Sequence, residues 1–314
     1  MLRQRTVREK ASCTGVGLHS GIEITLEILP APENNGITFV RTDMAPHAEL
    51  KACVDHVADT TLATTLGAGL NGSRAVVGTV EHLLAALLGL GIDNARILVD
   101  GPEIPVLDGS AAPFIELLQS AGLESQRKLK RFLSIKKEVE VVDGEKMAKL
   151  SPGSGLSVRC TVDFDHPLIS PTPYKFEFSE RGFMRELARA RTFGFLRDVE
   201  ALRARGLALG GSLDNAVVID QYQVLNPEGL RYPDEFVRHK VLDALGDMAL
   251  FGMPIIGKLE LHRSGHALNT RLVAAVLRDR KAYEIVEPAE ADLELASKGA
   301  ESRFPTFEPI ENIA

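Results

Sequence analysis

His239-Lys-Val-Leu-Asp-Ala-Leu-Gly-Asp247 has the spacing of an α-helix with one apolar side and one polar side. At about 100° per residue, the apolar side collects Val237, Val241, Ala244, Leu245, Met248 and Ala249, and the opposite arc collects His239, Lys240, Asp243, Gly246 and Asp247. Residues four apart lie one above the other, so His239 and Asp243 can reach one metal ion. The alternative is an amphipathic helix whose charged face meets water, since exposed charge pairs stabilise little.

A second helix is predicted over Thr79–Leu88, with Gly78 before it and Gly89 after it. Its apolar stripe comprises Val80, Leu83, Leu84, Leu87 and Leu88. His82 falls on the other side, beside small residues only, and has no partner within its own helix. We therefore expect His82 to face another element, the alternative being a lone surface histidine.

The two helices echo each other. When Val80–Ile92 is laid on Val241–Met253, the apolar positions correspond, Gly91 falls on Gly252, and His82 falls on Asp243. Two similar domains related by an approximate two-fold axis would present such equivalent positions to one shared site. The alternative is chance, because any two amphipathic helices align to some degree.

Other segments predict mixed α and β structure. Residues 22–28 alternate between apolar and polar side chains, which is typical of a strand with one buried face. Further elements are strands over Ala95–Val99 and Arg159–Phe164, a turn over Pro32–Gly36 and a helix over Pro113–Ala121. The polar run Glu124–Arg131 is the best boundary, which predicts domains over 1–124 and 132–314 joined by a linker at 125–131.

Composition narrows the function classes. The 314 residues are 45% hydrophobic and 25% charged, with a net charge of −7 and a pI near 5.7, which argues against a general nucleic-acid binder. The first twenty residues do not resemble a secretory signal, and no run of 18 apolar residues occurs, so we expect a cytoplasmic protein without a membrane span that can still encounter lipid. Three scattered cysteines indicate neither disulfides nor a thiolate zinc site.

Two imidazoles and one carboxylate, with a fourth position left for water, form a ligand set of catalytic zinc, and Fe²⁺ fits the same set. Glu81 is a natural base because it directly precedes His82, but the sequence pattern alone does not rank it above an ordinary surface glutamate. The HExxH arrangement is absent, since residue 86 is alanine. Asp247 suits an imidazole better than a metal, and His266 in Ser264–Asn269 is the candidate imidazole, able to donate a proton to a leaving amine. The alternative is that His266 is a structural histidine with its hydrogen bonds satisfied.

Nine short motifs follow one another along the chain: Thr14–Gly21, Thr79–Leu83, Gly91–Asn94, Pro105–Phe114, Asp163–Pro167, Ala190–Phe195, Gly210–Ala216, His239–Asp247 and Ser264–Asn269. In these motifs the chain resembles the UDP-3-O-acyl-N-acetylglucosamine deacetylases, the zinc amidases of lipid A biosynthesis. The resemblance covers nearly the whole chain. It implies an α+β fold of two similar domains, each a layer of helices on a sheet, with the active site between them.

The resemblance also implies roles for individual residues. His82, His239 and Asp243 would be the zinc ligands. Glu81 would be the general base acting on the metal-bound water and His266 the general acid, with Asp247 orienting His266. Thr192 would hydrogen-bond the oxyanion, and Lys240 would supply positive charge nearby.

Substrate recognition carries over more loosely. The resemblance implies that Phe164 stacks on uracil beside Asp163, that Phe195 and His19 line the nucleotide-sugar region, and that an insert at about 193–217 holds the acyl chain. The substrate-binding set is His19, Leu62, Asp163, Phe164, Phe193, Phe195, Val199, Ala208, Leu213 and Ala216. Without the resemblance, the insert would be interpreted as a helix, a Gly-rich turn and a strand covering a core. The poorly matched parts are the Thr65–Ala75 loop, Leu168–Lys175 and the tail after Arg280, where we expect no chemistry.

The resulting hypothesis is a monomeric enzyme that hydrolyses the acetamide of an acylated UDP-amino-sugar. A non-catalytic UDP-sugar-binding protein with a structural metal is the alternative, but structural zinc prefers four protein ligands, and the sequence offers three good ones. An Fe²⁺ oxygenase with the same ligands would need a 2-oxo acid site, which we do not find.

Overall fold

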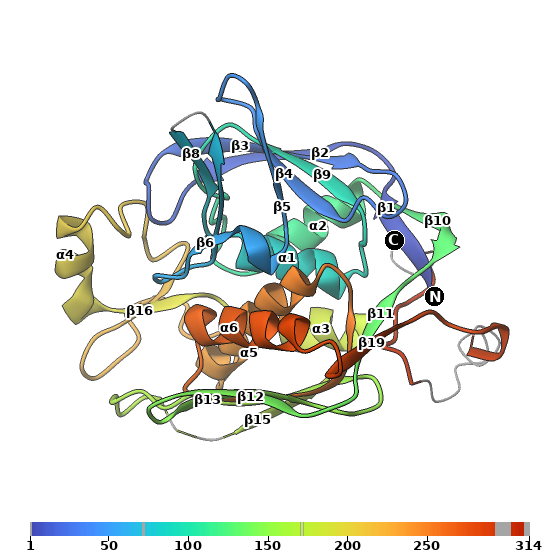
Figure 1. Ribbon diagram of the computed structural model, residues 1–314. Coiled ribbons are helices and arrows are strands. Elements are labelled where there is room, and N and C mark those ends of the chain that lie inside the picture. Colours follow the sequence, from blue (N-terminus) through green and yellow to red (C-terminus); the bar gives the residue numbers. More distant parts are fainter. Residues whose placement is uncertain (1, 71–72, 170, 172, 293–302, 311–314) are drawn as a thin grey trace.

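The computed structural model describes residues 2–70, 73–169, 171, 173–292 and 303–310. Two sheets form its outer layers, and two layers of helices lie between them (Figure 1). The main helices are α1 (Glu81–Gly89), α2 (Ala112–Ser120), α3 (Glu180–Glu186), α5 (Glu235–Met248) and α6 (His266–Arg278). Helices α1 and α2 cover one sheet, while α5 and α6 cover the other, so the two helix layers face each other.

The first sheet has the strand order β2-β3-β9-β4-β5. Its strands are β2 (Ala11–Val16), β3 (Glu23–Pro30), β4 (Ile37–Arg41), β5 (Ala48–Lys51) and β9 (Ala95–Val99). Strand β4 pairs with β9 in parallel, and the other neighbours are antiparallel. Ile24, Leu26 and Ile28 of β3 are fully buried, as their alternation with polar residues predicts.

The second sheet repeats this pairing in the order β12-β13-β18-β14-β15. Its strands are β12 (Val139–Asp143), β13 (Lys146–Ser151), β14 (Leu156–Thr161), β15 (Tyr174–Glu177) and β18 (Ile255–His262), and β11 (Phe132–Ile135) and β19 (Tyr283–Val286) extend it. In each of the two five-strand orders, the third and fourth strands are the parallel pair: β9 with β4 in the first sheet and β18 with β14 in the second. Helix α5 precedes β18 as α1 precedes β9. The predicted duplication is therefore confirmed.

The bounds of α1 and β14 differ from the predicted ones, and those of β9 agree. Helix α1 begins at Glu81, not Thr79, because Thr79 has a φ of 55°, which a right-handed helix excludes. Strand β9 has the predicted bounds. The strand predicted over Arg159–Phe164 is β14, which ends at Thr161 opposite His262, so residues 162–164 leave the sheet.

Two segments predicted as irregular are strands. Most of Thr65–Ala75 belongs to a small sheet formed by β6 (Val57–Asp59), β7 (Thr65–Leu70) and β8 (Ser73–Val77). The polar run at 125–131 lies mostly in β10 (Leu123–Leu129), which pairs with β1 (Arg3–Val7). The segments Leu168–Lys175 and the tail after Arg280 lie partly outside the described residues.

The insert at 193–217 stands at one end of the molecule, at the left of Figure 1. It contains β16 (Phe193–Phe195) and α4 (Leu196–Ala204), and β16 pairs in parallel with β17 (Val217–Ile219). Every residue of α4 is described, and none of them is buried. The helix of this segment therefore buries none of its residues, whereas Val217 at the end of the segment is fully buried. Two short 3₁₀ turns, η1 (Val54–His56) and η2 (Ala249–Phe251), complete the fold.

Helices α1 and α5 pack tightly in the centre. All nine residues of α1 are buried, because the helices α5, α2 and α3 pack around it. The crossing is close at Gly246, where a Cβ atom would lie 2.1 Å from the carbonyl oxygen of Glu81. His239, Asp243 and Asp247 are each at most 3% exposed, so the interpretation of their helix face as solvated is wrong. Among the described residues, no helix is long and apolar enough to cross a membrane.

Candidate active site

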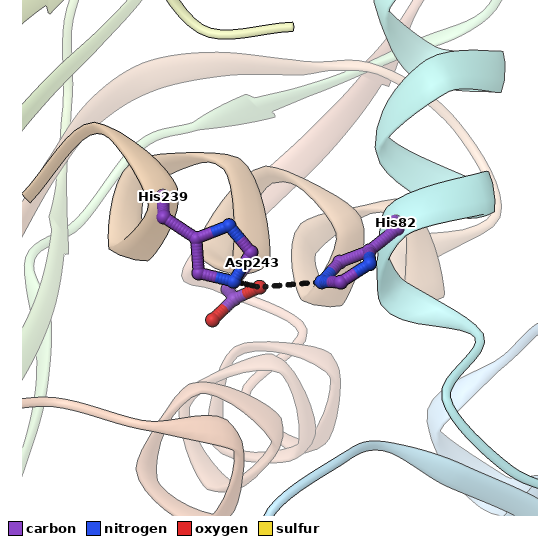
Figure 2. A group of neighbouring side chains, drawn as sticks. All are labelled: His82, His239 and Asp243. Carbon is purple, nitrogen blue, oxygen red and sulfur yellow. Dashed lines mark ion pairs between the residues drawn. The ribbon is translucent and has the colours of Figure 1, made fainter. Parts of the chain in front are cut away.

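Helices α1 and α5 bring His82, His239 and Asp243 together at their crossing (Figure 2). Oδ1 of Asp243 lies 3.2 Å from Nε2 of His239 and 3.4 Å from Nε2 of His82. A tetrahedral ion with bonds of about 2.0–2.1 Å places its ligand atoms about 3.3–3.4 Å apart. Both distances match this spacing, so the three side chains could hold one metal ion.

Hydrogen bonding supports the same interpretation. Nδ1 of His239 lies 3.0 Å from the carbonyl oxygen of Ala190, so it carries the proton, and the lone pair of Nε2 points at Asp243. Within the described part of the chain, Oδ1 of Asp243 is buried and accepts no hydrogen bond. A lone pair directed at an unpartnered carboxylate oxygen is unfavourable unless a cation lies between them. These residues fit a divalent cation.

The protonation states suit metal ligands. Burial lowers the pKa of His239 to about 3, which keeps this imidazole neutral. Burial would raise the pKa of Asp243, but His239 and Lys240 outweigh it and hold this pKa well below its usual value. Nζ of Lys240 donates to Oδ2 of Asp243 at 2.8 Å, which leaves Oδ1 for the two histidines. Lys240 therefore lies beside the metal cluster, as expected.

Glu81 begins α1 and points its carboxylate into the same site. Oε2 accepts a hydrogen bond from the backbone N–H of Thr64 at 3.0 Å, and Oε1 lies 3.7 Å from Nε2 of His266. Burial raises the pKa of Glu81, although the charges of His266 and His82 oppose the rise. A carboxylate with a raised pKa accepts a proton more readily than an exposed one.

His266 begins α6 on the opposite side. Nε2 lies 3.8 Å from Oδ2 of Asp243, and Nδ1 lies 2.9 Å from Oδ2 of Asp247. Burial alone would lower the pKa of His266, but the carboxylates of Asp247 and Glu81 outweigh burial and raise this pKa to about 10. Before a cation binds, the imidazole is therefore protonated at neutral pH. Asp247 contacts His266 and not the metal cluster, as predicted.

Thr192 lies on the segment that supports His239. Its backbone N–H donates to Gly109 O and its carbonyl accepts from Val217, both at 2.8 Å. The preceding residue, Arg191, is buried and donates to Glu235 at the start of α5, with Nε to Oε1 at 2.9 Å. This ion pair fixes the segment to the helix that carries His239.

Three phenylalanines lie close together beside His239. The ring of Phe164 lies 5.5 Å from that of Phe193 and 5.8 Å from that of Phe195, between ring centres. Phe193 in turn lies 6.3 Å from the ring of His239. Asp163 points away and pairs with Arg263 at 3.1 Å. The structure thus brings the three phenylalanines together next to the metal cluster.

The other predicted substrate residues lie along the insert and the loops that it meets. His19 is half-buried, its backbone N–H donates to Glu103, and burial lowers the pKa of its imidazole. Leu62 is 51% exposed in a turn, with a φ of 65°. Val199, Ala208 and Ala216 are half-buried, and Leu213 is 40% exposed. The backbone of the insert reaches the first half through Leu209 N–H, which donates to His19 O at 3.2 Å.

Sequence reasoning missed several residues that hold the site together. Thr64, Arg191, Glu235 and Asn269 are buried and contact the predicted catalytic residues or their supports. Arg191 and Asn269 belong to motifs of the family resemblance, and Glu235 lies one helical turn before His239, so these three had a signal. Thr64 had none, because it stands in an ordinary run of threonines and small residues.

The chain was compared with known proteins. Residues 4–278 match the family model described as UDP-3-O-acyl N-acetylglycosamine deacetylase. Three relatives named UDP-3-O-acyl-N-acetylglucosamine deacetylase come from Myxococcus xanthus (55% identical, covering 93% of this chain and 91% of the relative), Anaeromyxobacter dehalogenans (56%, 92% and 92%) and Shewanella violacea (53%, 91% and 93%). The chain belongs to the UDP-3-O-acyl N-acetylglycosamine deacetylase family.

Proposed function

We propose that this chain is a metal-dependent hydrolase that removes the N-acetyl group of a UDP-linked 3-O-acyl-N-acetylglucosamine, a step of lipid A biosynthesis, and releases acetate and the free amine. One observation carries the proposal. Nε2 of His266 lies 3.7 Å from the Glu81 carboxylate and 3.8 Å from that of Asp243, so an acid, a base and a metal ligand meet at one point. Amide hydrolysis needs these three groups together.

We propose Zn²⁺ as the cation, held by His82, His239 and Asp243, with Fe²⁺ as the competing ion. When bound, such a cation lowers the pKa of a coordinated water toward about 7 and polarises the amide carbonyl. In the described residues the possible metal cluster has three side chains, whereas structural zinc prefers four protein ligands. This count favours catalysis over a binding protein with a structural metal.

Glu81 and His266 divide the proton transfers. Glu81 accepts the proton of the attacking water, since burial makes its carboxylate more basic. His266 donates a proton to the leaving nitrogen, and Asp247 keeps this imidazole oriented through Nδ1. Because Oε1 of Glu81 and Nε2 of His266 both point into the site, one substrate amide can meet both groups.

Thr192 and Lys240 stabilise the negative charge that develops on the amide oxygen. Thr192 is held by hydrogen bonds at both of its backbone groups, and Lys240 is held by Asp243, so neither needs to reorganise during the reaction. We propose that the hydroxyl of Thr192 donates to this oxygen and that Lys240 supplies positive charge.

The substrate spans the aromatic cluster and the insert. Uracil stacks on Phe164, and Phe193, Phe195 and His19 line the sugar nucleotide. The acyl chain follows the insert, where Val199, Ala208, Leu213 and Ala216 offer apolar surface. The half-buried and exposed state of these side chains supports this role, because an acyl chain would cover them.

Both halves of the site come from one chain, which supports a monomer. We assign the halves to residues 1–124 and 132–314, with the segment 125–131 between them. His82 and Glu81 then belong to the first half, and the other proposed catalytic and metal-binding residues belong to the second.

Acetate release from the acylated UDP-sugar by protein with one zinc equivalent tests the function. Glu81→Gln should retain zinc and lose at least about a hundredfold in turnover, because the proton acceptor is gone. A tight complex with the UDP-sugar but no acetate would instead identify a binding protein. Normal deacetylation by a metal-free His82→Ala, His239→Ala double variant would refute the proposal.

A further inference from the structure

Thr64 ends the turn that leads into β7, and it is fully buried between α1, α5 and α6. Three groups of this residue are in use. Its backbone N–H donates to Oε2 of Glu81 at 3.0 Å, its carbonyl accepts from Val80 N–H at 3.2 Å, and its hydroxyl donates to Oδ1 of Asp247 at 2.6 Å. One residue from a loop therefore contacts both the base and the support of the acid.

The backbone contact sets the direction of the Glu81 carboxylate. With Oε2 held by Thr64, Oε1 is the oxygen that faces Nε2 of His266. Because the donor is a peptide N–H, any residue except proline can make this contact.

The side-chain contact is specific to a hydroxyl. Asp247 is fully buried, and its Oδ2 receives Nδ1 of His266 at 2.9 Å and Nδ2 of Asn269 at 2.8 Å. Oδ1 accepts a hydrogen bond from the Thr64 hydroxyl, whose oxygen also lies 3.2 Å from Nδ1 of His266. Without this hydroxyl, the buried Oδ1 has no hydrogen-bond donor. We expect the Asp247 carboxylate to rotate toward its remaining donors and the imidazole of His266 to move with it.

We propose that Thr64 is a positioning residue that fixes the separation and orientation of the base Glu81 and the acid His266. Its N–H and its hydroxyl belong to one residue, so their spacing is set by covalent geometry. The inference rests on the proposed function, because it assumes that Glu81 and His266 transfer the protons. Its physical content is the bridge from Glu81 through Thr64 to Asp247.

The test compares Thr64→Val, which has the same shape but no hydroxyl, with Thr64→Ser, which restores the hydroxyl. In zinc-loaded protein, Thr64→Val should lower kcat about 10- to 100-fold with KM and zinc content unchanged, whereas Thr64→Ser should stay within about threefold of the wild type. Thr6→Val is the matched control, since Thr6 is buried and its hydroxyl oxygen accepts from Ala31 N–H far from the site. It should leave kcat unchanged.

A double-mutant cycle with Asp247→Asn separates positioning from general destabilisation. The loss of kcat caused by Thr64→Val should shrink at least about threefold in the Asp247→Asn background, because the two changes break one bridge. If Thr64→Val does not fold, Thr64→Ala is measured in its place.

A kcat of Thr64→Val within twofold of the wild type, a Thr64→Ser variant as slow as Thr64→Val, or independent effects in the cycle would overturn the inference. Each of these outcomes leaves the deacetylase function standing. That function fails separately if the zinc-loaded wild type releases no acetate.

Discussion

The carboxylate of Asp247 is fully buried and accepts hydrogen bonds from Thr64, His266 and Asn269. Asp247 raises the pKa of His266, which lies in direct contact with it. Asp247 thus raises the pH at which His266 loses its proton.

Asp247→Asn removes this carboxylate and should lower the pKa of His266 from about 10 toward its ordinary value. NMR titration of labelled histidine in metal-free protein measures the shift. A folded-state pKa above the ordinary value of about 6.5 stabilises the fold fully below that pH, and the stabilisation is lost as the pH rises through the folded-state pKa. The unfolding free energy of the wild type should therefore fall more steeply above neutral pH than that of the variant. Asp163→Asn is the control, and equal titrations of His266 in wild type and Asp247→Asn would contradict the prediction.

The sequence predicted the residues of the site whose chemistry is unusual. Two histidines and an aspartate on helical faces stand out, because buried polar faces are rare. Thr64 was missed because threonine is common in turns and its partners lie 183 and 202 positions away along the chain. Such contacts depend on the tertiary fold, which residue type and local spacing do not encode.

The crossing of α1 and α5 sets the distance between His82 and the two proposed metal ligands on α5, His239 and Asp243. Gly246 permits this distance, because no side chain separates the helix from the carbonyl oxygen of Glu81. The distance between α1 and α5, and with it the spacing of the proposed metal ligands, therefore depends on Gly246.

Gly246→Ala should destabilise the protein by about 3 kcal/mol and weaken zinc binding, because its Cβ would lie 2.1 Å from the Glu81 oxygen and push α1 away. Urea unfolding and competition with a zinc chelator measure the two effects. The control is Gly194→Ala, whose Cβ would meet nothing within 4 Å. Wild-type zinc affinity in Gly246→Ala would show that the crossing tolerates a methyl group.

The insert carries apolar side chains that the rest of the protein leaves partly uncovered. Leu213→Asp should raise KM for the acylated substrate about tenfold through lost apolar contact, with little change in unfolding free energy, since Leu213 is 40% exposed. Val142→Asp, at a 53% exposed position on β12, is the control. KM of the variant and of the wild type is measured with two substrates that differ in acyl-chain length. The same increase in KM for both substrates would argue against contact between Leu213 and the acyl chain.

The local sequence pattern predicts the bounds of some helices and strands correctly and fails for others. Strand β9 has its predicted bounds, whereas α1 starts two residues late because Thr79 adopts a left-handed φ that its sequence does not require. Strand β10 was predicted as a linker because its side chains are mostly polar and exposed, and its pairing with β1 is a long-range property.

The two largest sheets of the molecule share one strand-pairing order, and the helices that cover them face each other. The similarity of two helices indicated this duplication, but the strand order did not follow from it, because β14 and β18 pair residues 101 positions apart, such as Leu156 with Gly257. The halves are joined further by buried charges. Nη1 of Arg5 on β1 donates to Glu180 on α3 at 3.0 Å, and both side chains are at most 1% exposed.

Glu180→Gln should lower the free energy of unfolding by about 3–5 kcal/mol, because it leaves the Arg5 guanidinium buried without a counter-charge. Chemical denaturation measures the loss. Lys10→Ala breaks an exposed pair with Glu27 and should cost less than about 1 kcal/mol. Equal costs for the two variants would mean that Arg5 finds another partner.

Because His82 stands on one half of the duplicated structure and His239 and Asp243 stand on the other, a bound cation also acts as a cross-link. Binding of the cation raises the free energy of unfolding by mass action. The increase is about 4 kcal/mol when the free cation concentration is a thousand times its Kd. Chelation should therefore lower the melting temperature in a calorimeter and increase cleavage by proteases. Metal scarcity would then reduce the lifetime of the enzyme as well as its rate.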